Sequence, residues 1–343
     1  MQPDLAARPR ASTLTEVARR AGVSLTTASK AINGQSRVSA QTRTRVLKAA
    51  GELSYTPNPM ARSLISGRSG TVGLIIIDSM AHRFAVPITL GAEAALGEIE
   101  LSMMITDARG DVSRLHEQAT MLRRRKVDGV IVVGDNQART PSITADLDAP
   151  VVYVYGETGL SRDIVHVPDD EGGAAAVVQH LVDIGRRRIA HLTGPAGSRA
   201  VTRRVKGVRS GLAANGLKLA APVERGLWSQ RWGRLAAEQL LVSTPGVDAI
   251  LCGSDQIASG VVDAVRAAGR RIPEDVAVTG YDNWPVFALE TSPALTTVDM
   301  NLEELGAAAV RDLFAVIDGV RVGGGVRLHE CTLVARGSSV FNG

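Results

Sequence analysis

Apolar residues recur every three or four positions along the first sixty residues of the chain, which is the spacing of short amphipathic helices. A first helix is predicted over 14–21, because Thr13 and Glu16 have the spacing of a capping box at its start. Gly22 then suits a tight turn, and Ser24 is placed to cap a second helix. The pattern therefore predicts two short helices joined by a turn.

The second of these helices has the features of a DNA-reading helix. Ala28, Ala31 and Ile32 face inward, and a third helix is predicted from a cap at Ser39 to about Leu53. The outer face of the second helix is formed by Leu25, Thr26, Ser29 and Lys30. In a helix-turn-helix the start of such a helix reaches base edges, while residues like Ser24 and Thr27 meet phosphates. An ordinary helical hairpin is the alternative interpretation of this pattern.

The segment after Tyr55 carries the signals of one further, very short helix. Asn58 is placed as an N-cap, Pro59 stands at the first helical position, and Gly67 ends the helix after about two turns. So short a helix is marginal in water and needs a partner to form. We therefore expect a hinge that orders when two copies meet on DNA, with Leu64 as an apolar wedge in the minor groove. A simple linker contact is the alternative role for Leu64.

From residue 70 onward, strand-length apolar runs alternate with helix-length stretches. The predicted strands are Thr71–Asp78, Leu101–Thr106, Gly129–Val133, Val151–Tyr155, Ile189–Leu192, Ala249–Cys252 and Val276–Gly280. The predicted helices are Pro87–Gly97, Asp111–Arg125, Glu171–Ile184, Arg199–Asn215, Arg231–Val242 and Asp255–Ala268. One more helix is expected between Val133 and Val151, and the pattern restarts at Ile164. This alternation predicts an α/β body of two doubly wound lobes with parallel sheets, and a ligand cleft between them.

The charge distribution separates the two parts of the chain. Residues 1–68 hold eleven basic against three acidic residues, a net charge of +8, and the remainder carries −4. A basic head on a mildly acidic body indicates that the head meets a polyanion. The two cysteines, Cys252 and Cys331, cannot form a disulfide framework or a zinc site by themselves, so we expect buried thiols.

Functional motifs of other protein classes are missing from the sequence. It has no phosphate loop, no nucleophile elbow and no His-Glu-x-x-His motif, and its six histidines are scattered. It also lacks a secretory signal and any apolar run long enough to span a membrane. We therefore expect a cytoplasmic protein that is not an enzyme and needs neither cofactor nor metal. An enzyme of doubly wound fold and a solute-binding protein are the alternatives.

The run from Thr13 to Leu64, TLTEVARRAGVSLTTASKAING…VSAQTRTRVLKAAGELSYTPNPMARSL, resembles the DNA-binding head and hinge of the lactose/galactose repressor (LacI/GalR) family. The resemblance extends to Arg336 and implies a body similar to periplasmic sugar-binding proteins. It also implies a repressor that binds a double-stranded DNA operator under the control of a small carbohydrate. No leucine heptads follow Phe341, so we expect a homodimer.

The resemblance divides the chain into a helix-turn-helix domain over 1–56, a hinge over 57–69 and an effector domain over 70–340. The first lobe is expected at about 70–162 and 292–321, and the second at about 163–291 and 322–340, with crossings near Arg162, Ser292 and Arg321. Leu25, Thr26 and Lys30 fall where the family reads bases. The full set of candidate DNA-binding residues is Thr15, Ser24, Leu25, Thr26, Thr27, Ser29, Lys30, Asn33, Tyr55, Asn58, Ala61, Arg62 and Leu64.

Candidate effector-binding residues lie at the ends of predicted strands and are named partly by the same resemblance. They are Asp78, Arg83, Phe84, Asp107, Arg109, Arg204, Trp228, Ser254, Asp255 and Asp282. For Asp255 and for a further candidate, Asp169, which both lie beside predicted helix starts, helix capping is the favoured role. The sequence departs from the family where His82-Arg83-Phe84-Ala85 replaces Asn-Pro-Phe-Phe. Because one aromatic ring is lost there and a cation appears, a phosphorylated or carboxylated effector stays possible beside a neutral sugar.

Overall fold

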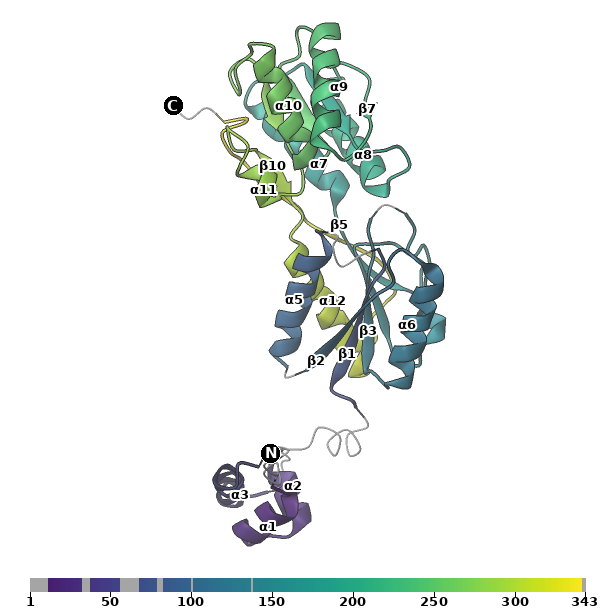
Figure 1. The fold of residues 1–343 in the computed structure, drawn as a ribbon, viewed down its shortest axis with the longest axis vertical. Coiled ribbons are helices and arrows are strands. Elements are labelled where there is room, and N and C mark those ends of the chain that lie inside the picture. Colours follow the sequence, from purple (N-terminus) through teal and green to yellow (C-terminus); the bar gives the residue numbers. More distant parts are fainter. Residues whose placement is uncertain are drawn as a thin grey trace, which may run out of the picture. The chain divides into compact units, whose positions relative to one another are not determined.

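The computed structural model describes residues 12–32, 38–55, 68–78, 83–99, 101–136 and 138–340 (Figure 1). The chain divides between Ser69 and Gly70 into two compact units. Among the described residues, no helix is both long enough and apolar enough to cross a membrane.

The first unit contains three short helices, α1 (Leu14–Ala21), α2 (Leu25–Ile32) and α3 (Ala40–Glu52). The capping box of Thr13 and Glu16 is present, and Gly22 turns the chain with a φ of 64°. The Ser24 side chain accepts a hydrogen bond from the amide of Thr27 at 3.1 Å, as its predicted capping role requires. Fully buried small side chains, among them Val17, Ala28 and Val46, form the centre of the unit.

The second unit begins with a lobe built on a six-stranded sheet in which every pairing is parallel. Its order is β2 (Ser102–Asp107), β1 (Thr71–Ile76), β3 (Gly129–Val133), β4 (Val151–Val154), β5 (Ile164–Pro168) and β11 (Gly325–His329). Helices α5 (Ala85–Gly97) and α12 (Leu302–Ile317) pack on one face, and α6 (Val112–Arg124) packs on the other. We call this the first lobe.

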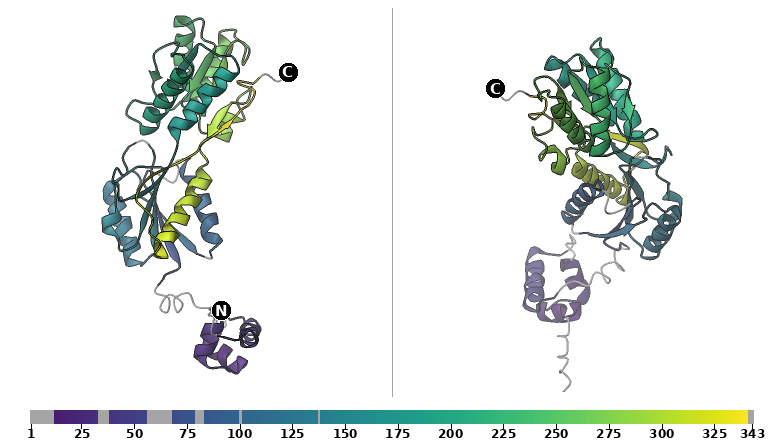
Figure 2. Two further views of the ribbon diagram at one scale, coloured as in Figure 1. Left: turned by 180° about the vertical axis from the view of Figure 1, so that it is seen from behind. Right: turned by 45° about the horizontal axis from the view of Figure 1, so that its top comes forward.

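The second lobe is a four-stranded parallel sheet with two helices on each face. Helices covering this sheet are visible in both views of Figure 2. Its strands, in order, are β7 (Glu224–Arg225), β6 (Ile189–Thr193), β8 (Ala249–Cys252) and β9 (Ala277–Thr279). Its helices are α7 (Asp170–Asp183) and α8 (Arg199–Ala214) on one face, and α9 (Gln230–Ser243) and α10 (Asp255–Ala267) on the other. A short helix, α11 (Pro285–Ala288), and the antiparallel pair β10 (Thr297–Asp299) and β12 (Thr332–Val334) complete the unit.

Three sequence-based expectations about the elements of the body were wrong. Between β3 and β4 the described residues hold only a single 3-10 turn, Thr144–Asp146, in place of the expected helix. Ile164 does not begin the second lobe, because β5 pairs with β4 and β11 in the first sheet. The chain therefore leaves the first sheet after Pro168, and β11 lies in the first lobe although 322–340 was expected in the second. Hydrophobic periodicity identifies a strand but not the neighbour that it pairs with.

Candidate functional site

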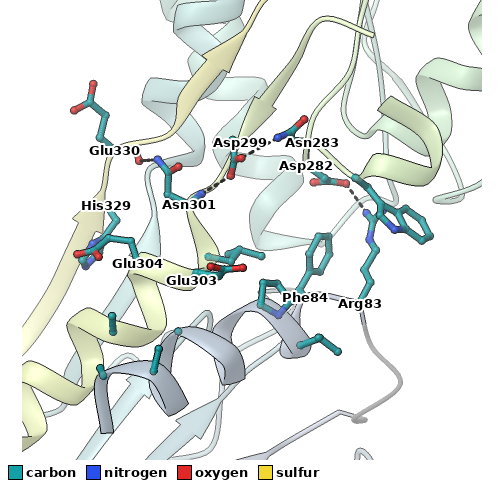
Figure 3. Close-up of a pocket in the computed structure, with 18 of the residues that line it drawn as sticks. Arg83, Phe84, Asp282, Asn283, Asp299, Asn301, Glu303, Glu304, His329 and Glu330 are labelled. Atoms are coloured by element: carbon teal, nitrogen blue, oxygen red, sulfur yellow. Dashed lines mark hydrogen bonds and ion pairs between the residues drawn. The ribbon is translucent and has the colours of Figure 1, made fainter. Parts of the chain in front are cut away.

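A groove of about 1230 Å³ opens where the two lobes of the second unit meet (Figure 3). One wall is formed by α5 along its length and by α12 from Leu302 to Arg311, and the loop that follows β9 forms the opposite wall. In that loop Asp282 and Asn283 have φ values of 104° and 48°, in the left-handed region that side chains other than glycine rarely adopt. Such strain persists where the surrounding contacts hold it, and it is concentrated at functional sites.

A buried charge network lies behind the groove. Arg204 on α8 donates from Nε to the carboxylate of Asp170 at 2.8 Å and from Nη1 to that of Asp282 at 3.3 Å. Its guanidinium also packs over the ring of Tyr281, 3.7 Å from the centroid. Burial by itself would lower the pKa of Arg204, but Asp170 and Asp282 raise it above its ordinary value. Arg204 is therefore a permanent positive charge at the base of the cleft.

Asp255 is the third carboxylate of this network. It lies at the start of α10, where it accepts hydrogen bonds from the amide of Trp284 at 2.7 Å and from the hydroxyl of Thr297. Burial and the nearby charge of Asp282 raise the pKa of Asp255 to about 7. Burial likewise raises the pKa of Asp282, against the lowering effect of Arg83 and Arg204. The network thus holds more carboxylates than guanidinium groups.

Arg83 connects the first lobe to this network. Its guanidinium forms an ion pair with Asp282, reaching that carboxylate across the groove from the start of α5 (Figure 3). It also lies over two aromatic rings, 4.3 Å from the centroid of Phe84 and 4.2 Å from that of Trp284. Each of these contacts favours a cation in this position.

A second set of contacts joins the lobes on the side of α7 and α8. Glu157, in the loop after β4, accepts hydrogen bonds from both Arg199 and Arg203. Asn136, after β3, donates to the remaining oxygen of Asp170 at 2.9 Å. A ligand that changes the angle between the lobes must therefore rearrange charged contacts on both sides of the cleft.

In the first unit, the exposed surface of α2 is formed by the side chains expected to read DNA. Leu25 is 50% exposed although it is apolar, and Thr26 is exposed beside it. Ser29 and Lys30 are half-buried on the same helix. Leu25 lies exposed at the start of the helix and is not part of the core. An apolar side chain in this position is suited to contact with a base.

Comparison with known proteins decides what these features mean together. Residues 13–58 match the model of bacterial regulatory proteins of the lacI family, and residues 178–339 match the periplasmic binding protein-like domain. The HTH-type transcriptional regulator CelR of Thermobifida fusca is 36% identical over 323 residues, which cover 91% of this chain and 94% of CelR. The chain belongs to the LacI family.

Further relatives agree with this assignment. The transcriptional repressor CytR of Escherichia coli K12 is 29% identical over 96% of both chains. A structure titled as a CelR–cellobiose complex superposes with a TM-score of 0.67 at 32% identity, covering 96% of this chain and 100% of CelR. The lac repressor dimer bound to operator and anti-inducer superposes with a TM-score of 0.74 at 27% identity, covering 97% of this chain and 100% of that one. This LacI-family protein is a transcription regulator with an N-terminal helix-turn-helix.

Only part of the expected effector set comes together in this LacI-family protein. Arg83, Phe84 and Asp282 line the groove, and Arg204 and Asp255 lie directly behind it. Ser254 accepts a hydrogen bond from the amide of Ile257 and caps α10, so the capping role expected for Asp255 was wrong. Asp169 does cap its helix, α7.

The other expected effector residues lie apart from the groove. Asp107 accepts a hydrogen bond from the amide of Arg109, whose own side chain is exposed. Asp78 is half-buried and does not line the groove. Trp228 packs against Gly194, where a Cβ would overlap its ring.

Of the expected DNA-binding residues, Thr15 is exposed on α1, and Tyr55 packs against the core of the first unit. Asn33, Asn58, Ala61, Arg62 and Leu64 lie outside the described residues.

The sequence interpretation missed several residues of the cleft. Asp170 is the main one, because nothing in the pair Asp169-Asp170 indicates which carboxylate caps the helix and which points inward. Trp284 and Glu157 were missed as well, although each follows a predicted strand within a few residues. The rule that ligands bind at the carboxyl ends of strands could have found both of them.

The histidines are less scattered than the sequence indicates. His166 on β5 and His329 on β11 lie side by side, with Nδ1 of the first 2.9 Å from Nε2 of the second. Asp312 lies 3.1 Å from the other ring nitrogen of His166. Among the described residues, no group of three potential ligands is arranged to hold a metal. Both cysteines are buried free thiols, as expected.

Proposed function

We propose that this LacI-family protein is a repressor whose affinity for its DNA operator is controlled by a small carbohydrate or carbohydrate derivative bound in the groove between the lobes. It acts in the cytoplasm as a homodimer, and it has no catalytic role. The observation that carries the proposal is the charge network of Arg204, Asp170 and Asp282. The network fixes Asp282, which lines the groove together with the aromatic rings of Phe84 and Trp284.

The groove has the chemistry that a polyhydroxylated ligand requires. Carboxylates and guanidinium groups form paired hydrogen bonds with neighbouring hydroxyl groups, and aromatic rings cover the apolar faces of sugars. Asp282 and Asn283 offer polar groups on one wall, and Phe84 and Trp284 offer rings nearby. The relative CelR is described in complex with cellobiose, which supports a sugar as the ligand class.

DNA recognition is assigned to the exposed surface of the helix-turn-helix. Leu25, Thr26 and Lys30 read bases, and Ser24 with Thr27 holds the phosphates. The remaining residues proposed for DNA binding are Thr15, Ser29, Asn33 and Tyr55 in the helix-turn-helix domain, and Asn58, Ala61, Arg62 and the minor-groove wedge Leu64 in the hinge. The net charge of +8 on residues 1–68 supplies the attraction that this surface needs toward DNA.

Dimer formation is supported by apolar side chains exposed on two elements. Val86 and Leu90 on α5 are 52% and 53% exposed, and Val286 and Leu289 on or after α11 are 59% and 54% exposed. Val86 and Pro285 line opposite walls of the same groove. Exposed apolar side chains that gather on one side of a protein are typical of protein–protein interfaces. The lac repressor, a structural relative, is described as a dimer on its operator.

The test combines DNA selection with a ligand panel. Duplexes that the full-length protein binds are selected from a random library, and binding is then measured with and without cellobiose and other sugars. An effector that couples to DNA binding is expected to weaken the affinity by about 5- to 150-fold. Failure to enrich any sequence would exclude a sequence-specific regulator. Turnover of any of the sugars would instead indicate an enzyme.

A further inference from the structure

The guanidinium of Arg83 fills a slot with three separate features that select a cation. The rings of Phe84 and Trp284 lie within 4.3 Å of its central carbon, and the carboxylate of Asp282 accepts its hydrogen bond. The Asp282 side chain is only 1% exposed, whereas that of Arg83 is 21% exposed. The carboxylate is thus a fixed part of the site, and the arginine approaches it from the groove side.

The charges around this slot are not balanced without Arg83. The carboxylates of Asp170 and Asp282 are paired with two guanidinium groups, those of Arg83 and Arg204, whereas nearby Asp255, whose pKa is raised to about 7, forms hydrogen bonds with Trp284 and Thr297 instead. Arg204 cannot move to compensate, because it is 3% exposed and also donates to the carbonyl of Gly253 at 2.6 Å. Removing the charge of Arg83 from the slot leaves two buried carboxylates, those of Asp170 and Asp282, with one guanidinium.

The rest of the groove adds to this negative balance. Among the described residues that line it, the Lys and Arg side chains are Arg83 and Arg311, and Arg311 is paired with Glu304. The acidic residues that line it are Glu98, Asp282, Asp299, Glu303, Glu304 and Glu330. An anion entering the groove therefore meets repulsion, and a cation meets attraction.

We propose that the slot formed by Phe84, Trp284 and Asp282 is a cation-binding site that Arg83 occupies as an internal competitor, and that the effector places a positive charge there, as an amino sugar does. This inference rests on the proposed function and narrows its ligand class. A ligand that carries an amine replaces one cation by another and keeps the charge balance. A neutral sugar leaves the carboxylates with one cation fewer, and a sugar phosphate worsens the imbalance. The phosphorylated effector that the sequence left open is therefore disfavoured.

The slot itself can be tested without knowing the effector. Arg83→Gly in the full-length chain empties the slot, and methylguanidinium then serves as the probe, with methylurea as its uncharged counterpart of similar shape. We expect methylguanidinium to bind the Arg83→Gly protein about tenfold more tightly than methylurea does, from the combined effect of the rings and the carboxylate. Binding is followed by calorimetry and by the rise in melting temperature at millimolar probe concentrations.

The controls separate the slot from general effects of the probes. The wild-type protein should show no preference for methylguanidinium, because Arg83 already fills the slot. Arg321→Gly removes an exposed arginine far along the chain and should behave as the wild type does. Arg83→Gln provides a second variant with a similar side-chain length, in case Arg83→Gly does not fold. Equal binding of methylguanidinium and methylurea, or binding of neither, in a folded variant would overturn the proposal.

The ligand class is tested with glucosamine, glucose and glucose 6-phosphate on the wild type and on Arg83→Gln. Glucosamine should stabilise both proteins more than glucose does, and the gain should be larger in Arg83→Gln, where no internal cation competes. Stronger stabilisation by glucose or by glucose 6-phosphate would reject a cationic effector. A preference for either kind of sugar leaves the proposed function standing, because that function is tested separately, by measuring DNA affinity with and without sugars.

Discussion

Arg204 on α8 and Asp170 at the start of α7 form an ion pair that is almost completely shielded from water. The Nε–Oδ1 distance is 2.8 Å, and the two side chains are 3% and 1% exposed. A buried pair contributes little stability relative to apolar residues of the same shape, but the loss of one partner leaves an uncompensated charge. The pair therefore keeps the base of the cleft in one arrangement.

Replacing Arg204 is expected to destabilise the protein as well as change its ligand response. Arg204→Met should lower the free energy of unfolding by about 3–5 kcal/mol, because Asp170 stays buried without its partner. Tryptophan fluorescence in a denaturant titration measures this change in the second unit, since all three tryptophans lie there. Arg209→Met, at an exposed position of the same helix, is the matched control and should change stability little. Equal effects of the two substitutions would contradict the role given to the pair.

The close approach of α5 and α12 depends on glycine. A methyl group at position 91 would overlap the carbonyl oxygen of Glu303, whereas one at Gly97 would meet no atom. Gly91→Ala should therefore destabilise the second unit by about 1–3 kcal/mol. Gly97→Ala, near the end of the same helix, should be neutral or stabilise by up to about 1 kcal/mol. Thermal unfolding of both variants distinguishes the two cases, and a tolerated Gly91→Ala would show that the helices can separate at little cost.

Two buried groups should give opposite pH dependences of stability. Burial lowers the pKa of His191 from 6.5 to about 4. The neutral histidine therefore contributes to the free energy of unfolding fully above pH 6.5, and this contribution is lost as the pH falls toward 4. Burial and the nearby Asp282 raise the pKa of Asp255 from 3.8 to about 7. The protonated carboxyl group therefore contributes to the free energy of unfolding fully below pH 3.8, and this contribution is lost as the pH rises toward 7. In the wild type the two effects oppose each other between pH 4 and 6.5.

Single substitutions should separate these two contributions. With Asp255→Asn, the free energy of unfolding should fall more steeply on acidification from pH 6.5 to 4, because the histidine contribution is left unopposed. With His191→Gln the fall should be shallower than in the wild type. The double variant should return toward the wild-type slope. Denaturant titrations at intervals across this range measure all four proteins, and unchanged slopes in both single variants would reject the assignment.

The DNA-reading role of Leu25 can be tested against a leucine of equal exposure. Leu25 on α2 and Leu47 on α3 are both 50% exposed in the first unit. Leu25→Ala should weaken binding to the selected operator by about 1–3 kcal/mol while leaving binding to an unrelated duplex nearly unchanged. Leu47→Ala should affect neither. Fluorescence anisotropy at fixed salt measures both affinities, and a parallel loss on the two duplexes would show that Leu25 does not read bases.

Local chemistry explains why the first unit was predictable from the sequence. The cap at Thr13, the turn at Gly22 and the cap at Ser39 act within three or four residues of their own positions. Strands were predictable in the same way. The predicted bounds Gly129–Val133 and Ala249–Cys252 are also the observed bounds, because each apolar run ends where its strand ends. Interactions of short range leave their pattern in the order of the residues.

By itself, the sequence determined the helix-turn-helix, the alternation of strands and helices and the family, because these depend on local spacing and on matched motifs. Only the tertiary structure decided that β5 and β11 belong to the first lobe, that His166 meets His329, and that Arg83 pairs with Asp282. The last two pairs are separated by 163 and 199 residues along the chain. Such contacts arise when parallel strands align their ends and two lobes close on each other. The cation slot at the centre of the cleft therefore exists only in the folded chain.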